Sequence, residues 1–373
     1  MPWREVSIMD QRREFVMLAS LAGANVRELC GRFGISRQTG YKWLRRAASG
    51  EGDLADRSRR PRTSPKRTTA FLEGAVLAVR DEQPAWGARK IAWRLQHDGI
   101  APPALSTIHA ILRRHGRVEE PRRPSRCHQR FEKAAPNLLW QMDFKGRVRI
   151  DRKTWCHPLT VLDDHSRFAV CLQACGDERT GTVKPLLEKT FCIYGLPEAL
   201  YLDNGSPWGG GVPGQWTPLG VWLLKLGIEV IHSRPYCPQG RGKNERFHRT
   251  LAAEVFALRR LRDLIQVQRA FDEWREIYNA ARPHQGLDMA VPASRYRPSS
   301  RPMPKTLPEA EYAPEDIVRR VGTTKSYVSF KNRLWKVPQA FSGERVAIRP
   351  RGQDGRYGIF FGATRIATID LNM

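Results

Sequence analysis

The chain has 373 residues, with 63 Lys and Arg against 38 Asp and Glu, and a formal net charge of +25. Its length predicts several domains, and its 41% hydrophobic content excludes a disordered chain. The charge indicates a polyanionic partner, although a generic basic protein of the ribosome or of a membrane surface would share it.

No apolar run is long enough to cross a membrane, and the first residues lack the apolar segment of a secretory signal. The seven cysteines are scattered and none lies in a Cys-x-x-Cys pair. This usage fits a reducing compartment and argues against disulfides or a zinc knuckle.

Residues 1–48 predict a helix-turn-helix DNA-binding domain. Asp10 is the expected cap of a first helix, a second helix covers 26–33, and Ser36 caps a third after the Gly34-Ile35 turn. A bundle with a merely solvated basic face is the alternative. On the DNA-binding interpretation, the residues that face the major groove or its phosphates are Ser36, Arg37, Gln38, Thr39, Tyr41, Lys42 and Arg45.

Residues 49–68 form a basic linker in which Arg59, Arg60 and Arg62 are expected to lie along phosphates, unless the linker is only a solubilising tether. Residues 69–116 predict a second helix-turn-helix or winged-helix-like domain, with Ser106 capping its last helix. A second basic connector covers 117–136. The residues expected to contact DNA from the second helical domain are Ser106, Thr107, His109, Arg113 and Arg114.

The pattern changes at residue 137. Three strand-like runs and then alternating helices and strands predict a mixed sheet flanked by helices over 137–297. Alternating apolar residues and tight turns predict a small antiparallel β-barrel over 315–373. The expected fold class is therefore multidomain α+β.

Three acidic residues stand out in the central segment. Asp143 and Asp203 close apolar, strand-like runs, whereas Glu245 opens a helix. Three carboxylates at one sheet edge repel one another unless cations neutralise them, and a magnesium pair in such a site breaks and joins phosphodiester bonds. Asp163 and Asp164 lie where a strand turns, and we interpret them as turn formers.

The segments around these acids resemble a known family. They are Leu139–Asp143, Leu202–Ser206, Arg234–His248 and Tyr278–Leu287. Residues 137–297 resemble the catalytic domain of retroviral-integrase-type DDE transposases, and the whole chain resembles a bacterial insertion-sequence transposase. One departure is that 41 residues separate Asp203 from Glu245, more than in many relatives. The extra residues fall in 208–216, a surface loop by composition with an open role.

The resemblance implies an RNase H-like core in which Asp143, Asp203 and Glu245 are both the catalytic residues and the ligands of two Mg²⁺ or Mn²⁺ ions. Arg249 is assigned to substrate phosphate, with an ion pair to Glu245, four residues away, as the alternative. The other residues expected to contact DNA near the scissile bond are Tyr236, Gln239, Lys243 and Asn244.

The expected function is a polynucleotidyl transferase that binds the terminal inverted repeats of its own element, cleaves the 3′ ends and transfers them into target DNA. Double-stranded DNA and at least one further copy of the chain are the expected partners, with no membrane, in the cytoplasm at the bacterial nucleoid. A non-catalytic DNA-binding regulator, or a decayed or domesticated copy, is the main alternative, and a nuclease that cuts but never joins is another. The joint presence of all three acids and their flanking residues favours the transposase.

Overall fold

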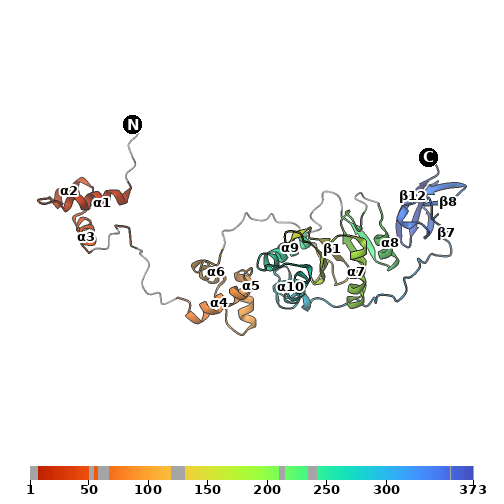
Figure 1. Cartoon of the computed structure of the whole chain (residues 1–373), viewed down its shortest axis with the longest axis horizontal. Coiled ribbons are helices and arrows are strands. Elements are labelled where there is room, and N and C mark those ends of the chain that lie inside the picture. The colour runs from red at the N-terminus through yellow and green to blue at the C-terminus, as the bar shows by residue number, and fades with distance from the viewer. Residues whose placement is uncertain are drawn as a thin grey trace. The chain divides into compact units, whose positions relative to one another are not determined.

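The computed structural model of the chain forms two compact units, Met1–Arg67 and Thr68–Met373 (Figure 1). It describes residues 7–49, 54–57, 67–118, 131–209, 215–233, 242–352 and 354–372. Five residues that the sequence assigns to DNA lie outside these ranges: Arg59, Arg60, Arg62, Tyr236 and Gln239.

The first unit contains three helices, as predicted: α1 (Ile8–Ala19), α2 (Val26–Arg32) and α3 (Arg37–Ala48). Ser36 caps α3 by accepting the backbone N–H of Thr39 at 3.2 Å. The predicted cap of α1 is wrong by three residues, because Ser7 caps this helix and accepts the N–H of Asp10. Asp10 instead lies in the first turn, where its charge favours the helix dipole.

Gly40 lets α3 pack closely on the other two helices. A Cβ at this position would lie 2.5 Å from Cys30 Sγ and 2.9 Å from the Phe15 ring. Phe15, Cys30 and Trp43 form the small core around it. The contact fixes which face of α3 is buried, and therefore which face remains exposed.

The second unit begins with another set of three helices: α4 (Ala70–Glu82), α5 (Ala88–His97) and α6 (Leu105–Arg114). Thr69 caps α4. The predicted cap of α6 is wrong, because this helix begins at Leu105 and Ser106 lies inside its first turn. Apolar side chains from all three helices and from the turn between α4 and α5 share one core: Val76, Val79, Trp86, Ile91, Leu95, Ile108, Ile111 and Leu112.

Glu73 connects α4 with the end of α6. Its Oε1 accepts hydrogen bonds from Arg114, at 2.5 Å, and from His115, at 2.7 Å. The bond from Arg114 is the main cause that lowers the pKa of Glu73 to about 2. Arg114, which the sequence assigns to DNA, therefore makes an ion pair within its own domain.

The described residues of the central region form a six-stranded mixed sheet in the order β2-β3-β1-β5-β6, with β4 on β3. β1 pairs antiparallel with β3, whereas β5 is parallel to both β1 and β6. The strands are β1 (Trp140–Phe144), β2 (Val148–Arg149), β3 (Trp155–Asp163), β4 (Ala169–Cys175), β5 (Ala199–Leu202) and β6 (Glu229–His232).

Helices cover the two faces of this sheet. One core is shared with α7 (Thr180–Tyr194) and α8 (Pro218–Lys225). A second core is shared with α9 (Gly242–Leu251) and α10 (Leu264–Glu276). Antiparallel strands followed by parallel ones, with helices on both faces, give the RNase H-like architecture that the resemblance implies.

The C-terminal strands form a four-stranded antiparallel sheet, β12-β11-β10-β7, and a β8–β9 hairpin. Lys331 and Asn332 turn this hairpin with positive φ angles, as the tightest hairpin turns require. Both sheets contribute to one core. The antiparallel strands predicted over 315–373 are confirmed, and among the described residues they form these two sheets rather than one continuous barrel. The strands are β7 (Ile317–Arg320), β8 (Tyr327–Phe330), β9 (Arg333–Lys336), β10 (Arg345–Pro350), β11 (Arg356–Phe361) and β12 (Thr364–Asp370).

The C-terminal domain packs on α8. Val221 of α8 belongs to the core of that domain, and the Trp216 ring meets the Phe341 ring edge to face, with 5.5 Å between centroids. Lys225 Nζ lies 2.6 Å from a carboxylate oxygen of Glu344. The helix therefore has one side in the core of the mixed sheet and another in the core of the C-terminal domain.

A buried ion pair joins the helices behind the sheet. Arg282 Nε donates to Glu254 Oε1 at 3.0 Å, and Trp274 Nε1 donates to Oε2 of the same carboxylate at 2.8 Å. Both partners of the pair are almost fully covered. Asn279, nearby, exchanges hydrogen bonds with the backbone of Ala169 in β4. The integrase-like tail of the sequence thus has a structural role in this domain.

Arg282→Met is expected to destabilise the protein by about 3 kcal/mol, because it leaves Glu254 buried without its cation. Thermal melting would measure the loss. Arg259→Met is the matched control, since the pair of Arg259 with Glu273 is exposed and contributes little. Equal melting temperatures for the two variants would contradict a stabilising role for the Glu254 pair.

Candidate active site

The pairing of β1 with β5 places two of the three acids side by side. Trp140 pairs with Leu200 and Gln141 with Tyr201 in parallel register. When this pairing is continued past the end of β5 with the same spacing between partners, Asp143 comes opposite Asp203. Because adjacent strands lie about 4.8 Å apart, both carboxylates emerge at the same edge of the sheet.

The third acid is carried by α9. Glu245 lies in the first turn of this helix and is exposed. His248, one turn later, is 2.8 Å from Thr160 Oγ1, and that hydroxyl donates to the Asp143 carbonyl at 2.9 Å. Because the Thr160 hydroxyl donates its hydrogen to the Asp143 carbonyl, it accepts from His248, whose Nε2 is the donor. This chain of hydrogen bonds connects α9 to the strand of the first acid.

The segment after β5 surrounds Asp203. Its Oδ1 accepts the Gly205 backbone N–H at 2.8 Å and the indole N–H of Trp208. His232, at the end of β6, donates from Nδ1 to the Asp203 carbonyl at 2.8 Å. Burial lowers the pKa of His232. The second acid therefore has both its side chain and its main chain held by hydrogen bonds.

The donor atoms fit a hard divalent ion. Carboxylate oxygens suit Mg²⁺ and Mn²⁺, and the parallel register brings the strand ends that carry Asp143 and Asp203 next to each other. Across the described residues, no three His, Cys, Asp or Glu side chains lie close enough to hold one metal ion. Glu245 is carried by α9, a helix that contacts β1.

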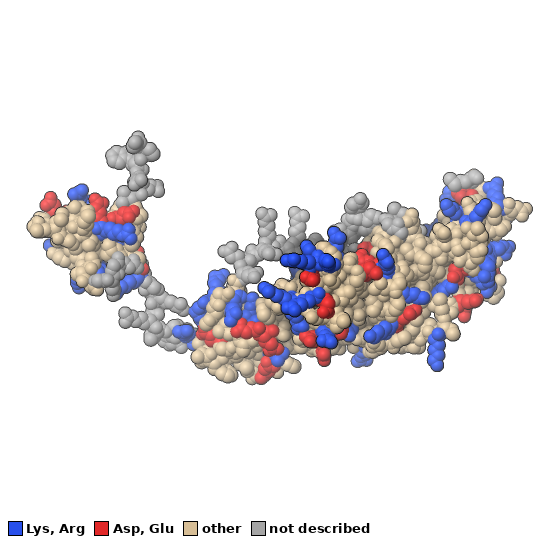
Figure 2. Space-filling model, viewed as in Figure 1, with Lys and Arg blue, Asp and Glu red and all other residues tan. Residues whose placement is uncertain are grey.

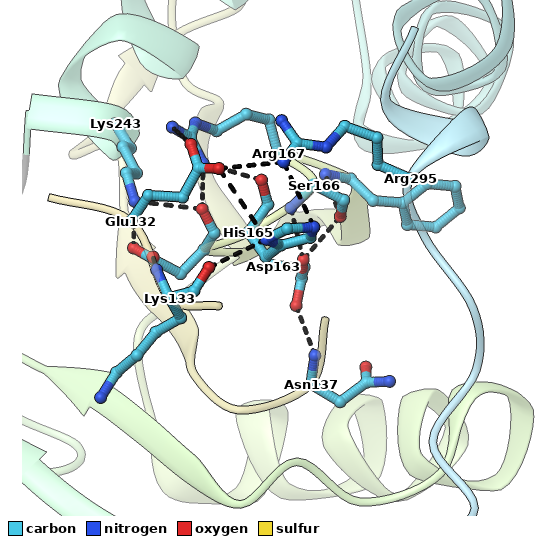
Figure 3. Close-up of polar contacts among 11 residues, drawn as sticks. Glu132, Lys133, Asn137, Asp163, His165, Ser166, Arg167, Lys243 and Arg295 are labelled. Atoms are coloured by element: carbon cyan, nitrogen blue, oxygen red, sulfur yellow. Dashed lines mark hydrogen bonds and ion pairs between the residues drawn. The ribbon is translucent and has the colours of Figure 1, made fainter. Parts of the chain in front are cut away.

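A polar network lies at the opposite end of β1 from Asp143, where Asp163 pairs with Trp140 (Figure 3). Asp163 forms the turn that the sequence predicts, since its Oδ1 accepts the backbone N–H and the hydroxyl of Ser166 at 2.7 and 2.6 Å. Its Oδ2 accepts the N–H of Asn137 at 2.7 Å. These bonds close the β3–β4 connection.

Asp164 has a larger role than the turn former expected from the sequence. It is 1% exposed, and its Oδ1 lies 2.5 Å from Lys243 Nζ in α9 and 2.8 Å from Gln141 Nε2 in β1. Burial lowers the pKa of Lys243 to about 8, while the hydrogen bond with Asp164 opposes this shift. The sequence pattern does not reveal the pair, because its partners are 79 residues apart.

The other sequence-predicted residues of α9 differ in exposure. Asn244, next to Lys243, is 2% exposed. Arg249 is exposed, and in the described part of the chain it makes no ion pair with Glu245. Of these three residues assigned to DNA, Arg249 is therefore the one whose side chain is presented to solvent beside the third acid.

The helices α3 and α6 expose most of the side chains that the sequence assigns to DNA. On α3, Ser36 and Thr39 hydrogen-bond to each other at the cap. The side chains exposed along one face of α3 are Arg37, Gln38, Tyr41, Lys42 and Arg45. On α6, Ser106, His109 and Arg113 are exposed, whereas Thr107 is half-buried. Figure 2 shows Lys and Arg on every folded part of the chain on the face that is drawn.

Comparison with protein families assigns most of the chain. Residues 133–238 and 226–292 each match an integrase core domain, and residues 316–373 match the C-terminal domain of IS481 family transposases. Residues 11–62 match a helix-turn-helix domain, and 39–112 match a homeodomain-like domain.

The chain belongs to the integrase-like superfamily of bacterial insertion-sequence transposases. Its core is similar to that of the insertion element IS476 39.2 kDa protein of Xanthomonas euvesicatoria, at 28% identity over 58% of this chain. The match covers 64% of that relative, so the chain spans less than two thirds of its length. The insertion element IS407 31.7 kDa protein of Burkholderia multivorans is 25% identical, with 59% of this chain and 80% of the relative covered.

Among solved structures, this transposase chain overlaps with the simian T-cell lymphotropic virus intasome in complex with PP2A regulatory subunit B56 gamma. The identity is 15%, the match covers 79% of this chain and 99% of that chain, and the TM-score is 0.39. Separately, none of the helices in the described ranges is long and apolar enough to span a membrane.

Lys243→Met is expected to destabilise this transposase by about 3 kcal/mol, because it leaves the Asp164 carboxylate buried without its cation. Hydrogen exchange should also become faster at the start of α9, which the pair ties to β1 and β3. Arg249→Met, on the exposed face of the same helix, is the control. Unchanged exchange together with weaker DNA binding in Lys243→Met would instead support the phosphate contact that the sequence predicts.

Proposed function

We propose that this chain is a DNA transposase that binds the terminal inverted repeats of its own element, cleaves the 3′ ends and joins them to target DNA. Asp143, Asp203 and Glu245 would be its catalytic residues. The observation that supports the proposal is the parallel register of β1 with β5 in an integrase-type sheet, whose continuation by the same offset would set Asp143 beside Asp203.

The three acids would hold two divalent ions, Mg²⁺ or Mn²⁺. When bound, such a pair lowers the pKa of the attacking hydroxyl and stabilises the leaving oxygen of an in-line displacement. Asp143 and Asp203 would serve as rigid ligands from adjacent strands, and Glu245 as the ligand from α9. Arg249, exposed one turn beyond Glu245, would bind a phosphate of the DNA and so orient the scissile bond.

The helical domains would select the element ends. The exposed face of α3 carries Arg37 and Gln38 at the start of the helix, where side chains reach base edges in helix-turn-helix complexes. Lys42 and Arg45, further along, would contact phosphates. Joining two ends requires at least two copies of the chain, so we expect a dimer or a larger assembly on DNA.

Strand joining in vitro tests the catalytic assignment. Wild-type protein with labelled element ends, plasmid target and Mg²⁺ or Mn²⁺ should give joined products, while Asp143→Asn, Asp203→Asn and Glu245→Gln each lower the yield about 100-fold or more. Each substitution removes a charged ligand and leaves the size of the side chain nearly unchanged. Gel separation of labelled products measures the yield.

Glu276→Gln is the matched control, because Glu276 is exposed on α10 and belongs to no predicted site. It should join strands as the wild type does. Binding of ends without cleavage, unchanged by the three substitutions, would support the non-catalytic regulator or a decayed copy instead. Cleavage without joining would support a nuclease.

Recognition by α3 has a separate test. Arg37→Ala and Gln38→Ala should each weaken binding to the element ends about tenfold, with little change for unrelated DNA, because base contacts carry sequence information. Fluorescence anisotropy with both DNAs at fixed salt would measure the ratio. Arg27→Ala, exposed on α2, should instead weaken both equally or not at all. A uniform loss in Arg37→Ala would contradict its assignment to base edges.

A further inference from the structure

Trp208 lies directly against the second acid, at the start of the 208–216 segment where we expect the extra residues from the sequence. Its indole N–H donates to Asp203 Oδ1, the same oxygen that accepts the Gly205 N–H. The side chain is 1% exposed, so this bond is shielded from solvent. An indole is a donor only, and it therefore matches a carboxylate in its ionised form.

The ring of Trp208 also reaches the strand of the first acid. It stacks on the Phe144 ring with 5.3 Å between centroids and 16° between planes. Phe144 directly follows Asp143 in β1. One side chain thus contacts the residue after the first acid through its face and the second acid through its edge, which ties the ends of β1 and β5 together.

The chain turns tightly to bring Trp208 into this place. The Gly209 N–H donates to the Gly205 carbonyl at 2.7 Å. A Cβ on Gly209 would lie 2.4 Å from the carbonyl oxygen of Asn204, so no other residue fits without movement of the backbone. The turn is therefore closed on itself immediately after Asp203.

The other end of the segment is anchored at α8. The Thr217 hydroxyl is 3.2 Å from the Trp208 carbonyl and also accepts the Gly220 N–H as the cap of α8. Trp216 meets His232 edge to face, with 6.2 Å between centroids, and His232 donates to the Asp203 carbonyl. Both described ends of the segment thus contact the surroundings of the second acid.

We propose that Trp208 is a positioning residue for the second acid. The indole N–H sets the orientation of the Asp203 carboxylate, and the stack on Phe144 fixes the distance between the ends of β1 and β5. This arrangement restrains the two carboxylates that would share a divalent ion. The inference rests on the proposed function, and it assigns a role to the first part of the 208–216 segment.

Metal affinity tests this inference. Trp208→Phe keeps an aromatic ring for the stack but removes the donor to Asp203. Partners that orient a metal ligand typically contribute about 10- to 100-fold to affinity, so Mn²⁺ binding by the whole chain should weaken by about tenfold or more. Titration of Mn²⁺ followed by its electron paramagnetic resonance signal gives the dissociation constant. The Mn²⁺ concentration for half-maximal strand joining should rise by a similar factor.

Trp140→Phe is the matched control. Trp140 is buried in the same core, and its indole N–H donates to the Asn137 side-chain oxygen at 3.1 Å rather than to an acid. Both substitutions replace Trp by Phe, so each removes the same atoms and the one hydrogen bond that the indole N–H donates. Both should melt at similar temperatures in a chelator, but only Trp208→Phe should bind Mn²⁺ more weakly.

Wild-type affinity for Mn²⁺ in folded Trp208→Phe would overturn the inference and leave the proposed function standing. Wild-type protein that binds no Mn²⁺ would overturn the proposed function, and the inference with it. If Trp208→Phe does not fold, Phe144→Leu tests the stack alone. A severalfold loss of Mn²⁺ affinity in that variant would support the inference, and unchanged affinity would overturn it.

Discussion

The candidate active site depends on one pairing, the parallel alignment of β1 with β5. A shift of this pairing by one residue would turn one acid to the opposite face of the sheet, because side chains alternate along a strand. The register is fixed on one face of the sheet and at the strand end. Met142, Leu200 and Leu202 pack into the core shared with α7 and α8, while His232 and Trp208 hold Asp203 at the strand end.

Glu245 is positioned by a different kind of constraint. It stands on a helix rather than a strand, so its place depends on how α9 is attached to the sheet. Phe247 provides the apolar contact, and polar links at Lys243 and His248 connect the helix to β3. These links flank Glu245 in the sequence, which restrains both the rotation of the helix about its axis and its sliding along the sheet.

Much of the fold follows from local sequence pattern. The cap at Ser36, the acids at the ends of strands and the alternation in the C-terminal strands are local signals, and the structure has the corresponding elements. The sequence does not reveal the pairs of Asp164 with Lys243, Glu73 with Arg114 or Arg282 with Glu254, since each joins residues that only the tertiary fold brings together. From sequence alone, Lys243 and Arg114 are interpreted as DNA contacts. The sequence around a basic residue does not show whether its side chain pairs with an acid inside the protein. The prediction that Ser106 caps α6 was wrong, because a serine fits the first turn of a helix as well as it fits the cap position.

The attachment of the C-terminal domain to α8 makes the integrase core hard to separate as an independent module. Val221 and Trp216 are covered by that domain, and Lys225 pairs with Glu344. A core that ended before the C-terminal strands would expose an apolar strip on the helix that follows the Trp208 turn. Exchange of C-terminal domains between related elements would therefore require matching changes on α8, so we expect the two to vary together in evolution and to be inherited as a single functional block.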